Sequence, residues 1–587
     1  MSALPRHIEQ ARQLLEQVPW YQALPEVARD ELLSGCEWRV LPGGAVLFFE
    51  GETSDSAYLV LSGSLGAFRR DEQGVHLIGQ IVMGETVGEL GVLTQRPRTA
   101  SVRALRDSEV LRLPAEHLEA VGAKYPQALV GLSRLALRRA TEPRVARYQD
   151  AAPRTIALLA QSAGVDLFLF AHTLSQSLGR YGRVRILKND SAGLAPAQYL
   201  AIESEVRFVL YVADADDAEW RSQCRRQADA WLMLARASEQ PMAQAEILIQ
   251  RQPDAVPPPE HLILLHDEKP RLGAGRRWHG LREKARLHHV RHAADIGRVA
   301  RLICGQGLSL VLSGGGARGF AHIGVIKALR EAGFEIDSVG GTSIGAVIGA
   351  GIAADWSVEE MTETFRRCFY DTNPLSDYTL PLVSLVSGRK ASRLLQEAFG
   401  SRDIEDLPLP YFCVSSNLTS GQAAVHHQGP LWQWLRASIA IPGLLPPVCH
   451  QGQVHVDGGV INNLPVDVMR SRQQGEVIAV DIGGNYVIKS AIDEVDLPPI
   501  WQLATEWFRN RRRPKLSQIL LRAGMVNSGS AALEARELST LLLTPPLNDI
   551  DLLEWKAFYR AIDRGYQHTL RIVGGRKDVL SEAATLL

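Results

Sequence analysis

A serine in residues 341–345 (GTSIG) has the surroundings of a catalytic nucleophile. The pentapeptide fits the pattern G-x-S-x-G and lies between an expected strand at 336–339 and an expected helix at 346–354. A strand that turns sharply into a helix exposes the serine Oγ, and glycines two residues on either side avoid a clash of Cβ atoms. The helix N-terminus also favours negative charge that develops beside the serine. Ser343 is therefore a candidate nucleophile for acyl transfer.

A glycine-rich loop upstream could stabilise the charge that such an attack creates. Residues 313–319 (SGGGARG) follow an expected strand at 309–312 and open an expected helix at 320–332. Three successive glycines allow backbone N–H groups to converge on one point, as an oxyanion hole requires. One such donor typically contributes roughly 10²–10³ in rate. A further short motif, Asp457-Gly458-Gly459, follows an apolar run.

The same loop also spells a dinucleotide-binding fingerprint, G-x-G-x-x-G, at Gly314, Gly316 and Gly319. In that fingerprint the acidic residue stands at the end of the second strand, whereas Asp337 stands near its start. A Walker phosphate loop is excluded because Phe320 stands where lysine is required. We therefore favour a hydrolase loop over a dinucleotide site.

With these three segments in view, the chain resembles the patatin-like phospholipases. The strings VGGTSIGA (339–346) and DGGVINNLP (457–465) resemble the neuropathy target esterase branch of that family. The resemblance implies an α/β hydrolase domain that cleaves carboxylic esters of phospholipids or lysophospholipids through a Ser–Asp dyad, with no catalytic metal and no cofactor. It implies that Ser343 is the nucleophile and Asp457 the base. It also implies an oxyanion hole formed by Gly314, Gly315, Gly316 and Arg318.

Two histidines raise the alternative of a Ser–His–Asp triad, because an ordinary aspartate with a pKa of about 3.9 is a weak base. His455 lies two residues before Asp457 on an expected strand, so both side chains share a face, but such neighbours stand roughly 7 Å apart. His322 follows the glycine loop, where a role in helix packing is expected. We predict a dyad, with neither histidine essential.

The amino-terminal part has the pattern of a β-sandwich, roll or barrel. Short apolar runs alternate with glycine-rich turns from residue 38 to 113. Within them, residues 87–93 (VGELGVL) and 96–101 (RPRTAS) combine a short helix N-terminus with an arginine, which together can hold a phosphate.

This segment resembles the phosphate-binding cassette of cyclic nucleotide-binding domains. The resemblance implies that Glu89 binds the ribose 2′-OH and Arg98 the cyclic phosphate. The remaining expected site residues line the pocket: Gly88, Thr99, Ala100 and Ser101. Because both charged residues are present, we favour binding over a β-roll that serves only as a scaffold. Whether the nucleotide is cAMP or cGMP stays open.

Between residues 153 and 302 the pattern changes to buried strands separated by helices. Strands are expected at 155–159, 184–187, 206–212, 230–234 and 262–265. Such runs are typical of a small parallel α/β domain, here interpreted as a spacer. The predicted fold is therefore multidomain: a cyclic nucleotide-binding β-roll with flanking helices at 1–150, an α/β spacer at 151–304, and a patatin-like esterase domain with C-terminal helices at 305–587.

The composition of the chain limits the classes of partner that it is expected to bind. The 587 residues carry a net charge of −1, which gives no general attraction to nucleic acid, and the six cysteines have no zinc-binding spacing. Residues 1–16 lack the apolar core of a signal peptide, and no run of about 18 apolar residues suits a membrane span. We expect a cytoplasmic protein, with any membrane contact peripheral at the inner membrane surface.

Three further segments leave alternatives open. The apolar stretches 378–386 and 437–447 suit either the rim of an acyl-chain groove or covered core. Aromatic and basic residues in 501–515 suit either anionic lipid headgroups or a solvated helix end. The alternative to an active esterase is a nucleotide-responsive regulatory protein whose esterase domain does not turn over.

Overall fold

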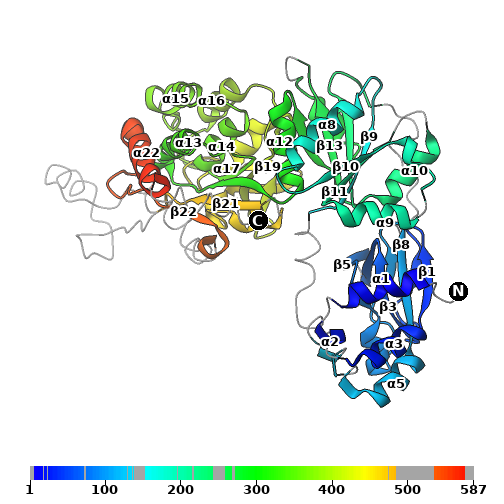
Figure 1. The fold of residues 1–587 in the computed structure, drawn as a ribbon. Coiled ribbons are helices and arrows are strands. Elements are labelled where there is room, and N and C mark those ends of the chain that lie inside the picture. Colours follow the sequence, from blue (N-terminus) through cyan, green and yellow to red (C-terminus); the bar gives the residue numbers. More distant parts are fainter. Residues whose placement is uncertain are drawn as a thin grey trace, which may run out of the picture. The chain divides into compact units, whose positions relative to one another are not determined.

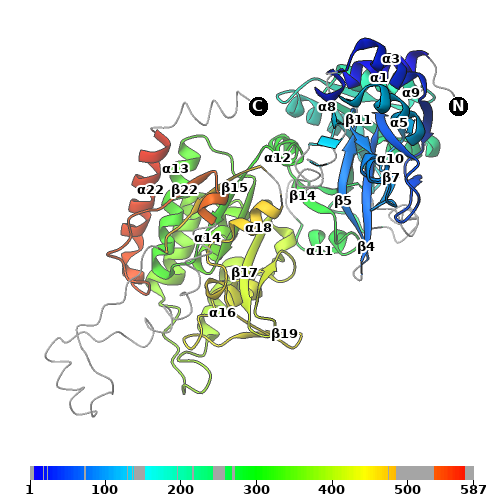
Figure 2. The ribbon, with the colours of Figure 1, turned by 90° about the horizontal axis from the view of Figure 1, so that it is seen from below.

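The computed structural model (Figures 1 and 2) divides into two compact units. One comprises Met1–Ile263 and Glu283–Arg286, and the other Leu264–Arg282 and Leu287–Leu587. The structure describes residues 5–16, 19–22, 24–71, 74–127, 152–194, 196–213, 217–241, 258–267, 271–472, 475–483 and 535–574, with a few positions between 130 and 137. The aromatic and basic segment 501–515 lies outside these residues, as does most of 125–148, whose Leu-, Ala- and Arg-rich sequence predicts a helix.

The amino-terminal part is a β-roll of two four-stranded antiparallel sheets. The first has the order β1 (Glu37–Leu41), β8 (Ser108–Pro114), β3 (Ser56–Ser62), β6 (Thr86–Val87), and the second β2 (Val46–Phe48), β7 (Ser101–Ala104), β4 (Ser64–Asp71), β5 (Gly74–Val82). The accompanying helices are α1 (Pro5–Leu15), α2 (Pro19–Gln22), α3 (Glu26–Ser34), α4 (Glu89–Thr94) and α5 (Ala115–Lys124). The predicted β-roll is confirmed.

The next sheet has six strands in the order β10 (Val184–Leu187), β11 (Phe208–Ala213), β9 (Thr155–Ala160), β12 (Ala230–Arg236), β13 (Glu260–Leu265), β14 (Arg286–Val290). The pairings from β10 to β12 are parallel, and β11 is buried along its whole length, as expected for a sheet covered on both faces. The helices that lie between these strands or directly after the last of them in the chain are α8 (Leu167–Leu178), α9 (Pro196–Glu205), α10 (Ala218–Gln227), α11 (Ala274–His279) and α12 (Ala293–Ile303), of which the last two belong to the carboxy-terminal unit. The sequence predicted five of these strands and missed β14, because RLHHV lacks the apolar run of a buried strand.

The carboxy-terminal sheet carries the residues of the glycine-rich motifs. Its order is β19 (Val448–His450), β20 (Gln453–Asp457), β17 (Tyr411–Asn417), β16 (Ser338–Thr342), β15 (Gly307–Leu312), β21 (Gly475–Val480), β22 (Leu541–Leu543), with β18 (Gln422–His426) paired to β17. The strands from β17 to β22 are parallel, and β18, β19 and β20 are antiparallel additions. The α-helices are α13 (Ala321–Glu331), α14 (Ile344–Ala353), α15 (Val358–Phe365), α16 (Arg389–Phe399), α17 (Leu431–Ser438), α18 (Val466–Ser471) and α22 (Phe558–Gly574). Short helical turns are η2 (Gly316–Phe320), η4 (Ile404–Asp406), η5 (Gly458–Val460) and η6 (Trp555–Ala557), with a π-helical turn η3 (Arg366–Asp371).

Strand register explains why distant motifs meet in this sheet. Thr342 at the end of β16 is level with Val414 of β17, and the next residue of β17, Ser415, is level with Asp457 at the end of β20. Ser343 follows Thr342 directly, so it reaches the same height as Asp457. The loop after β15 leaves the same edge of the sheet, because β15 and β16 are parallel neighbours. Three chain segments therefore converge at one end of the sheet.

Candidate active site

Ser343 occupies a strained turn between β16 and α14. Its backbone has φ 54° and ψ −127°, a region that residues with a Cβ rarely adopt. The glycines of the pentapeptide are required by close backbone contacts. A Cβ on Gly341 would lie 2.7 Å from the carbonyl of Gly345, and a Cβ on Gly345 would collide with the carbonyl of Leu312. The turn thus holds the serine side chain clear of the helix that follows.

The Ser343 Oγ donates a hydrogen bond of 2.7 Å to Asp457 Oδ2. The second carboxylate oxygen, Oδ1, accepts the Gly459 N–H at 2.8 Å. Burial of Asp457 raises the pKa of its carboxyl to about 6, and the hydrogen bonds from Ser343 and Gly459 oppose this shift. A carboxylate with a pKa of about 6 accepts a proton more readily than an ordinary aspartate. The geometry therefore supplies what a lone aspartate base needs.

The glycine loop lies against this pair, and its amides are not equivalent. The Gly314 N–H donates to the Asn463 carbonyl at 3.2 Å, so this amide is already engaged. Among the residues that the structure describes, no protein acceptor is recorded for the amides of Gly315 and Gly316. Of the three glycines, these two are free to donate to a developing oxyanion.

Arg318, the fourth residue expected at the oxyanion hole, is buried and bonds to main-chain carbonyls elsewhere. Its Nε donates to Ile550 O at 2.8 Å, and its Nη1 donates to Gly483 O at 3.1 Å. The neighbouring Ala317 N–H donates to Leu552 O at 2.8 Å. These bonds attach the loop to segments far downstream in the chain, which indicates that Arg318 supports the loop.

Two polar residues that the sequence did not single out support the site. Ser438 is completely buried at the end of α17, where its Oγ accepts the Ser343 N–H at 2.9 Å and donates to Val414 O at 2.6 Å. Asn463 holds Gly314 from both sides, because its carbonyl accepts the Gly314 N–H and its Nδ2 donates to Gly314 O at 3.3 Å. The string DGGVINNLP, which contains Asn463, could have pointed to that residue. For Ser438 the sequence offers no indication beyond its apolar surroundings.

The two histidines of the triad alternative bond elsewhere. His455 Nδ1 lies 3.0 Å from the Ser415 Oγ, and His322 Nε2 donates to the Ser313 carbonyl at 3.0 Å. Burial lowers the pKa of His322 to about 4. Neither histidine is a hydrogen-bond partner of Ser343 or Asp457 in the described part of the chain. Asp337, the acid of the dinucleotide alternative, is engaged by Arg301 at 2.7 Å.

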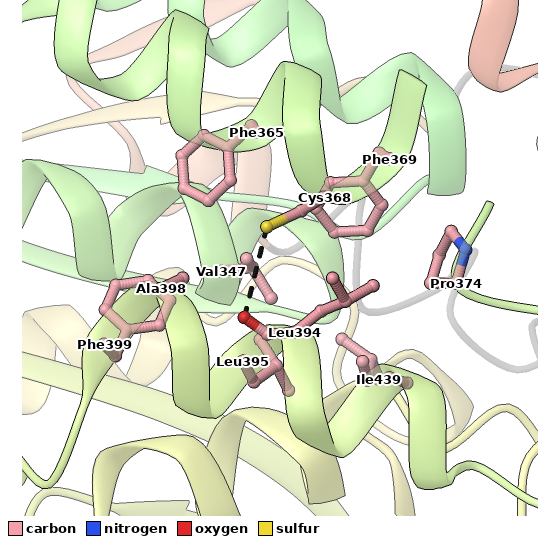
Figure 3. Close-up of a pocket in the computed structure, with 11 residues that line it drawn as sticks. Val347, Phe365, Cys368, Phe369, Pro374, Leu394, Leu395, Ala398, Phe399 and Ile439 are labelled. Atoms are coloured by element: carbon pink, nitrogen blue, oxygen red, sulfur yellow. Dashed lines mark hydrogen bonds between the residues drawn. The ribbon is translucent and has the colours of Figure 1, made fainter. Parts of the chain in front are cut away.

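An apolar pocket lies beside the nucleophile helix (Figure 3). Val347, one turn after Ser343 on α14, and Ile439, which follows Ser438, lie on its wall. The other lining residues come from α15, the turn after it, and α16: Phe365, Cys368, Phe369, Pro374, Ala391, Leu394, Leu395, Ala398 and Phe399. The lining is hydrocarbon with one thiol, so the pocket suits an aliphatic chain.

The residues expected at a nucleotide site come together in the β-roll. Glu89 is the first residue of α4 and is buried, and Gly88 precedes it with φ 83°. The Arg98 guanidinium is also buried, donates to Gly88 O at 3.0 Å and to Ser56 O at 2.7 Å, and lies over the Phe48 ring. Ala100 is buried, Thr99 is exposed, and the Ser101 Oγ accepts the Glu50 N–H at 3.0 Å.

Burial lowers the pKa of Arg98. The site places the Arg98 guanidinium and the Glu89 carboxylate about the start of a short helix, and the Asp55 carboxylate lies 3.6 Å from the guanidinium. Those are the donor types that a phosphate and a ribose hydroxyl require. The residues present therefore fit a cyclic mononucleotide.

Among the residues that the structure describes, no helix is both long enough and apolar enough to cross a membrane.

Three protein-family models match consecutive parts of the chain. Residues 38–125 match "Cyclic nucleotide-binding domain", residues 152–302 match "Neuropathy Target Esterase family P-loop like domain", and residues 310–470 match "Patatin-like phospholipase". The third match contains Ser343 and Asp457 and ends before the segments that hold Arg318.

Curated relatives are similar to the chain over most of its length. The chain is 31% identical to Patatin-like phospholipase domain-containing protein 6 of Homo sapiens over 638 residues, which cover 94% of this chain and 45% of that protein. It is 31% identical to Lysophospholipase NTE1 of Cryptococcus neoformans var. neoformans serotype D over 532 residues, 76% of this chain and 32% of that protein. The chain thus spans less than half the length of either relative.

Among solved structures, the chain is similar to the regulatory domain of Toxoplasma gondii PKA with cAMP, at 21% identity and a TM-score of 0.20 over 20% of this chain and 46% of that one. The chain therefore carries a cyclic nucleotide-binding domain, a neuropathy target esterase family P-loop-like domain and a patatin-like phospholipase domain, in that order, and it is similar over most of its length to a patatin-like phospholipase domain-containing protein and a lysophospholipase.

Proposed function

We propose that the chain is a serine esterase that hydrolyses carboxylic ester bonds of phospholipids or lysophospholipids through a Ser343–Asp457 dyad. The observation that carries this proposal is the 2.7 Å hydrogen bond from Ser343 Oγ to a buried carboxylate, at a serine held in a strained turn. The names of the curated relatives and the matched family support the same chemistry.

Asp457 acts first as a general base. It accepts the Ser343 proton while the Oγ attacks the ester carbonyl, and the carbonyl oxygen becomes negative. The amides of Gly315 and Gly316 stabilise that charge, helped by the N-terminus of α14. Protonated Asp457 then gives its proton to the leaving alcohol, which leaves an acyl-serine. Water, deprotonated by Asp457, attacks the acyl-serine, and the breakdown of the second tetrahedral intermediate frees the fatty acid and returns the proton to Ser343.

The acyl chain enters the apolar pocket that begins at Val347. Two residues of the pocket wall lie close to the nucleophile turn: the Val347 N–H donates to Ser343 O, and Ile439 follows Ser438, whose Oγ accepts the Ser343 N–H. Burial of hydrocarbon contributes about 0.8 kcal/mol for each methylene. The proposed enzyme therefore prefers long acyl chains to acetate.

An activity screen tests this proposal. Short-chain esters and lysophospholipids are offered to the wild-type chain and to Ser343→Ala, with Ser177→Ala as the matched control, a half-buried serine of α8 that is far from the motifs in sequence. We expect the wild type and the control to be active and Ser343→Ala to be inactive but folded. An organophosphate should label Ser343 covalently. Labelling at another residue, or wild-type rates in Ser343→Ala, would refute the assignment.

We further propose that the N-terminal domain binds a cyclic mononucleotide, with Arg98 on the phosphate and Glu89 on the ribose. The buried cation and carboxylate at the start of α4 support this. Calorimetry of the full chain with cAMP and with cGMP tests it, and hydrolysis rates with and without nucleotide test regulation. Nucleotide binding by a chain with no hydrolytic activity would favour the alternative, a nucleotide-responsive regulatory protein. We propose a cytoplasmic location, with any membrane contact peripheral.

A further inference from the structure

Six consecutive residues of the carboxy-terminal unit, 378–383 (YTLPLV), form an exposed apolar loop. The exposed fractions are 79% for Tyr378, 72% for Leu380, 84% for Leu382 and 67% for Val383. Single exposed apolar side chains are common on proteins, but a continuous run of them marks a contact surface. This segment was expected to be either a groove rim or covered core, and the exposure of its tip excludes covered core.

The loop has a formed base. The Thr379 N–H donates to Leu385 O at 3.1 Å, and Tyr378 forms an isolated β-bridge with Val386. Below it, the Ser387 N–H donates to Asp377 O at 2.8 Å, and the Ser387 Oγ donates to the Asp377 carboxylate at 2.6 Å. Hydrogen bonds that close the base hold the apolar tip away from the domain.

The base of the loop is continuous with the proposed catalytic centre. The Leu385 and Val386 N–H groups donate to Gly443 O at 2.9 Å and Leu444 O at 3.1 Å. A few residues earlier in that partner segment, the Ala440 carbonyl accepts the Asp457 N–H at 2.9 Å. Pro374 and Ala391, on either side of the loop in the sequence, line the apolar pocket with Ile439. An acyl chain that follows the loop toward its base would therefore reach the apolar pocket beside Ser343.

Charge at the base indicates which surface the loop meets. Arg389 is exposed directly after the base, and Lys390 Nζ donates to Ser376 Oγ at 2.6 Å beside it. The nearby Asp377 carboxylate accepts hydrogen bonds from the Ser387 Oγ and the Lys390 N–H, which stabilise its negative charge at the base. A hydrocarbon tip above a cationic base matches the acyl layer and anionic headgroups of a lipid leaflet.

We propose that residues 378–383 insert into the surface of a lipid leaflet and deliver its acyl chains to the pocket, with Arg389 and Lys390 at headgroup level. The delivery step rests on the proposed function; the insertion does not. A second copy of the chain is the competing occupant.

Vesicle co-sedimentation tests the proposal with the full chain and vesicles of phosphatidylcholine and phosphatidylglycerol in equal parts. The test variant is Leu380→Ser/Leu382→Ser/Val383→Ser. The control changes three scattered, exposed apolar residues, 67%, 63% and 56% exposed: Val27→Ser/Leu169→Ser/Leu418→Ser. We expect roughly a 100-fold loss of vesicle partitioning in the test variant, since three partly inserted side chains are removed, and little change in the control. Arg389→Glu/Lys390→Glu should weaken binding only when phosphatidylglycerol is present.

Hydrolysis separates this inference from the proposed function. The test variant should keep the wild-type rate on a water-soluble short-chain ester and lose most of its rate on lipid in vesicles. Equal vesicle binding by wild type and test variant, or no binding by wild type, would overturn the insertion. Loss of dimers in the test variant, seen by light scattering without a change in vesicle binding, would assign the loop to a second copy instead. A wild type that binds vesicles but cleaves no ester would overturn the function and leave the insertion standing.

Discussion

Acidification should switch off the proposed esterase at a pH set by Asp457. The base must be ionised to accept the Ser343 proton, and burial raises its pKa to about 6. With that value the ionised fraction falls from about nine tenths at pH 7 to about one tenth at pH 5. The rate should therefore fall about tenfold between these pH values. An aspartate with an ordinary pKa of about 3.9 would give almost no change over the same range.

The assay is kcat/KM on an uncharged short-chain ester, with the fatty acid quantified by chromatography so that the readout is independent of pH. Circular dichroism at pH 5 confirms that the chain is still folded. His455→Ala and His322→Ala are the controls, because an ordinary histidine titrates in the same range, whereas burial lowers the pKa of both of these. An inflection near pH 4, or one that disappears in either histidine variant, would refute the reasoning.

The buried Asp457 carboxylate should also lower the stability of the folded chain. Its folded pKa lies above its unfolded value, so ionised Asp457 destabilises the fold above pH 6, and the penalty disappears as the pH falls below about 4. The shift of about two pKa units corresponds to roughly 3 kcal/mol at most. Asp457→Asn should therefore abolish turnover and raise the unfolding midpoint of the esterase domain at pH 8, with little effect at pH 4. A variant that is less stable than wild type at pH 8 would contradict the raised pKa.

Four further variants test the supports of the two sites. Ser438→Ala should lower kcat roughly tenfold while labelling of Ser343 by organophosphate slows in parallel, because the nucleophile's amide loses its acceptor; unchanged kinetics would remove Ser438 from the site. Gly315→Ala should reduce turnover more than stability, since its Cβ meets only the flexible end of a side chain, whereas Gly316→Ala should lose both, because a positive φ and a main-chain carbonyl oppose it; equal thermal melts for the two would disprove this. Arg98→Ala should weaken cyclic nucleotide binding about 100-fold in calorimetry and leave short-chain hydrolysis unchanged without nucleotide; unaltered affinity would place the phosphate elsewhere.

Sequence reasoning reached the parts of the site that are set by backbone geometry. The G-x-S-x-G turn and the glycine loop leave strong marks in a sequence, because few residues other than glycine tolerate their close approaches, and the fold class could be predicted from them and from the strand pattern. Ser438 was missed because its role depends on a contact between the end of α17 and the nucleophile turn, which no local pattern records. The sequence also could not show that the Gly314 amide differs from those of Gly315 and Gly316. The Gly314 N–H donates to the carbonyl of Asn463, which is distant in the sequence. The exposure of loop 378–383 could not be read from its apolar composition, which also suits a core.

The attachment of the glycine loop to the end of the chain bears on how the protein comes into being. Ala317 and Arg318 bond to carbonyls of residues 552 and 550, and α22 lies so close to α13 that a Cβ on Gly324 or Gly565 would collide with the opposing backbone. During synthesis, the segments that carry Ser343 and Asp457 leave the ribosome well before residues 550–552 and α22 do. A nascent chain, or a chain that ends at a premature stop after residue 483, would contain Ser343 and Asp457 but would lack residues 550–552, whose carbonyls hold the glycine loop. Ester cleavage by the proposed esterase would then begin only after residues 550–552 have been made and have folded against the glycine loop.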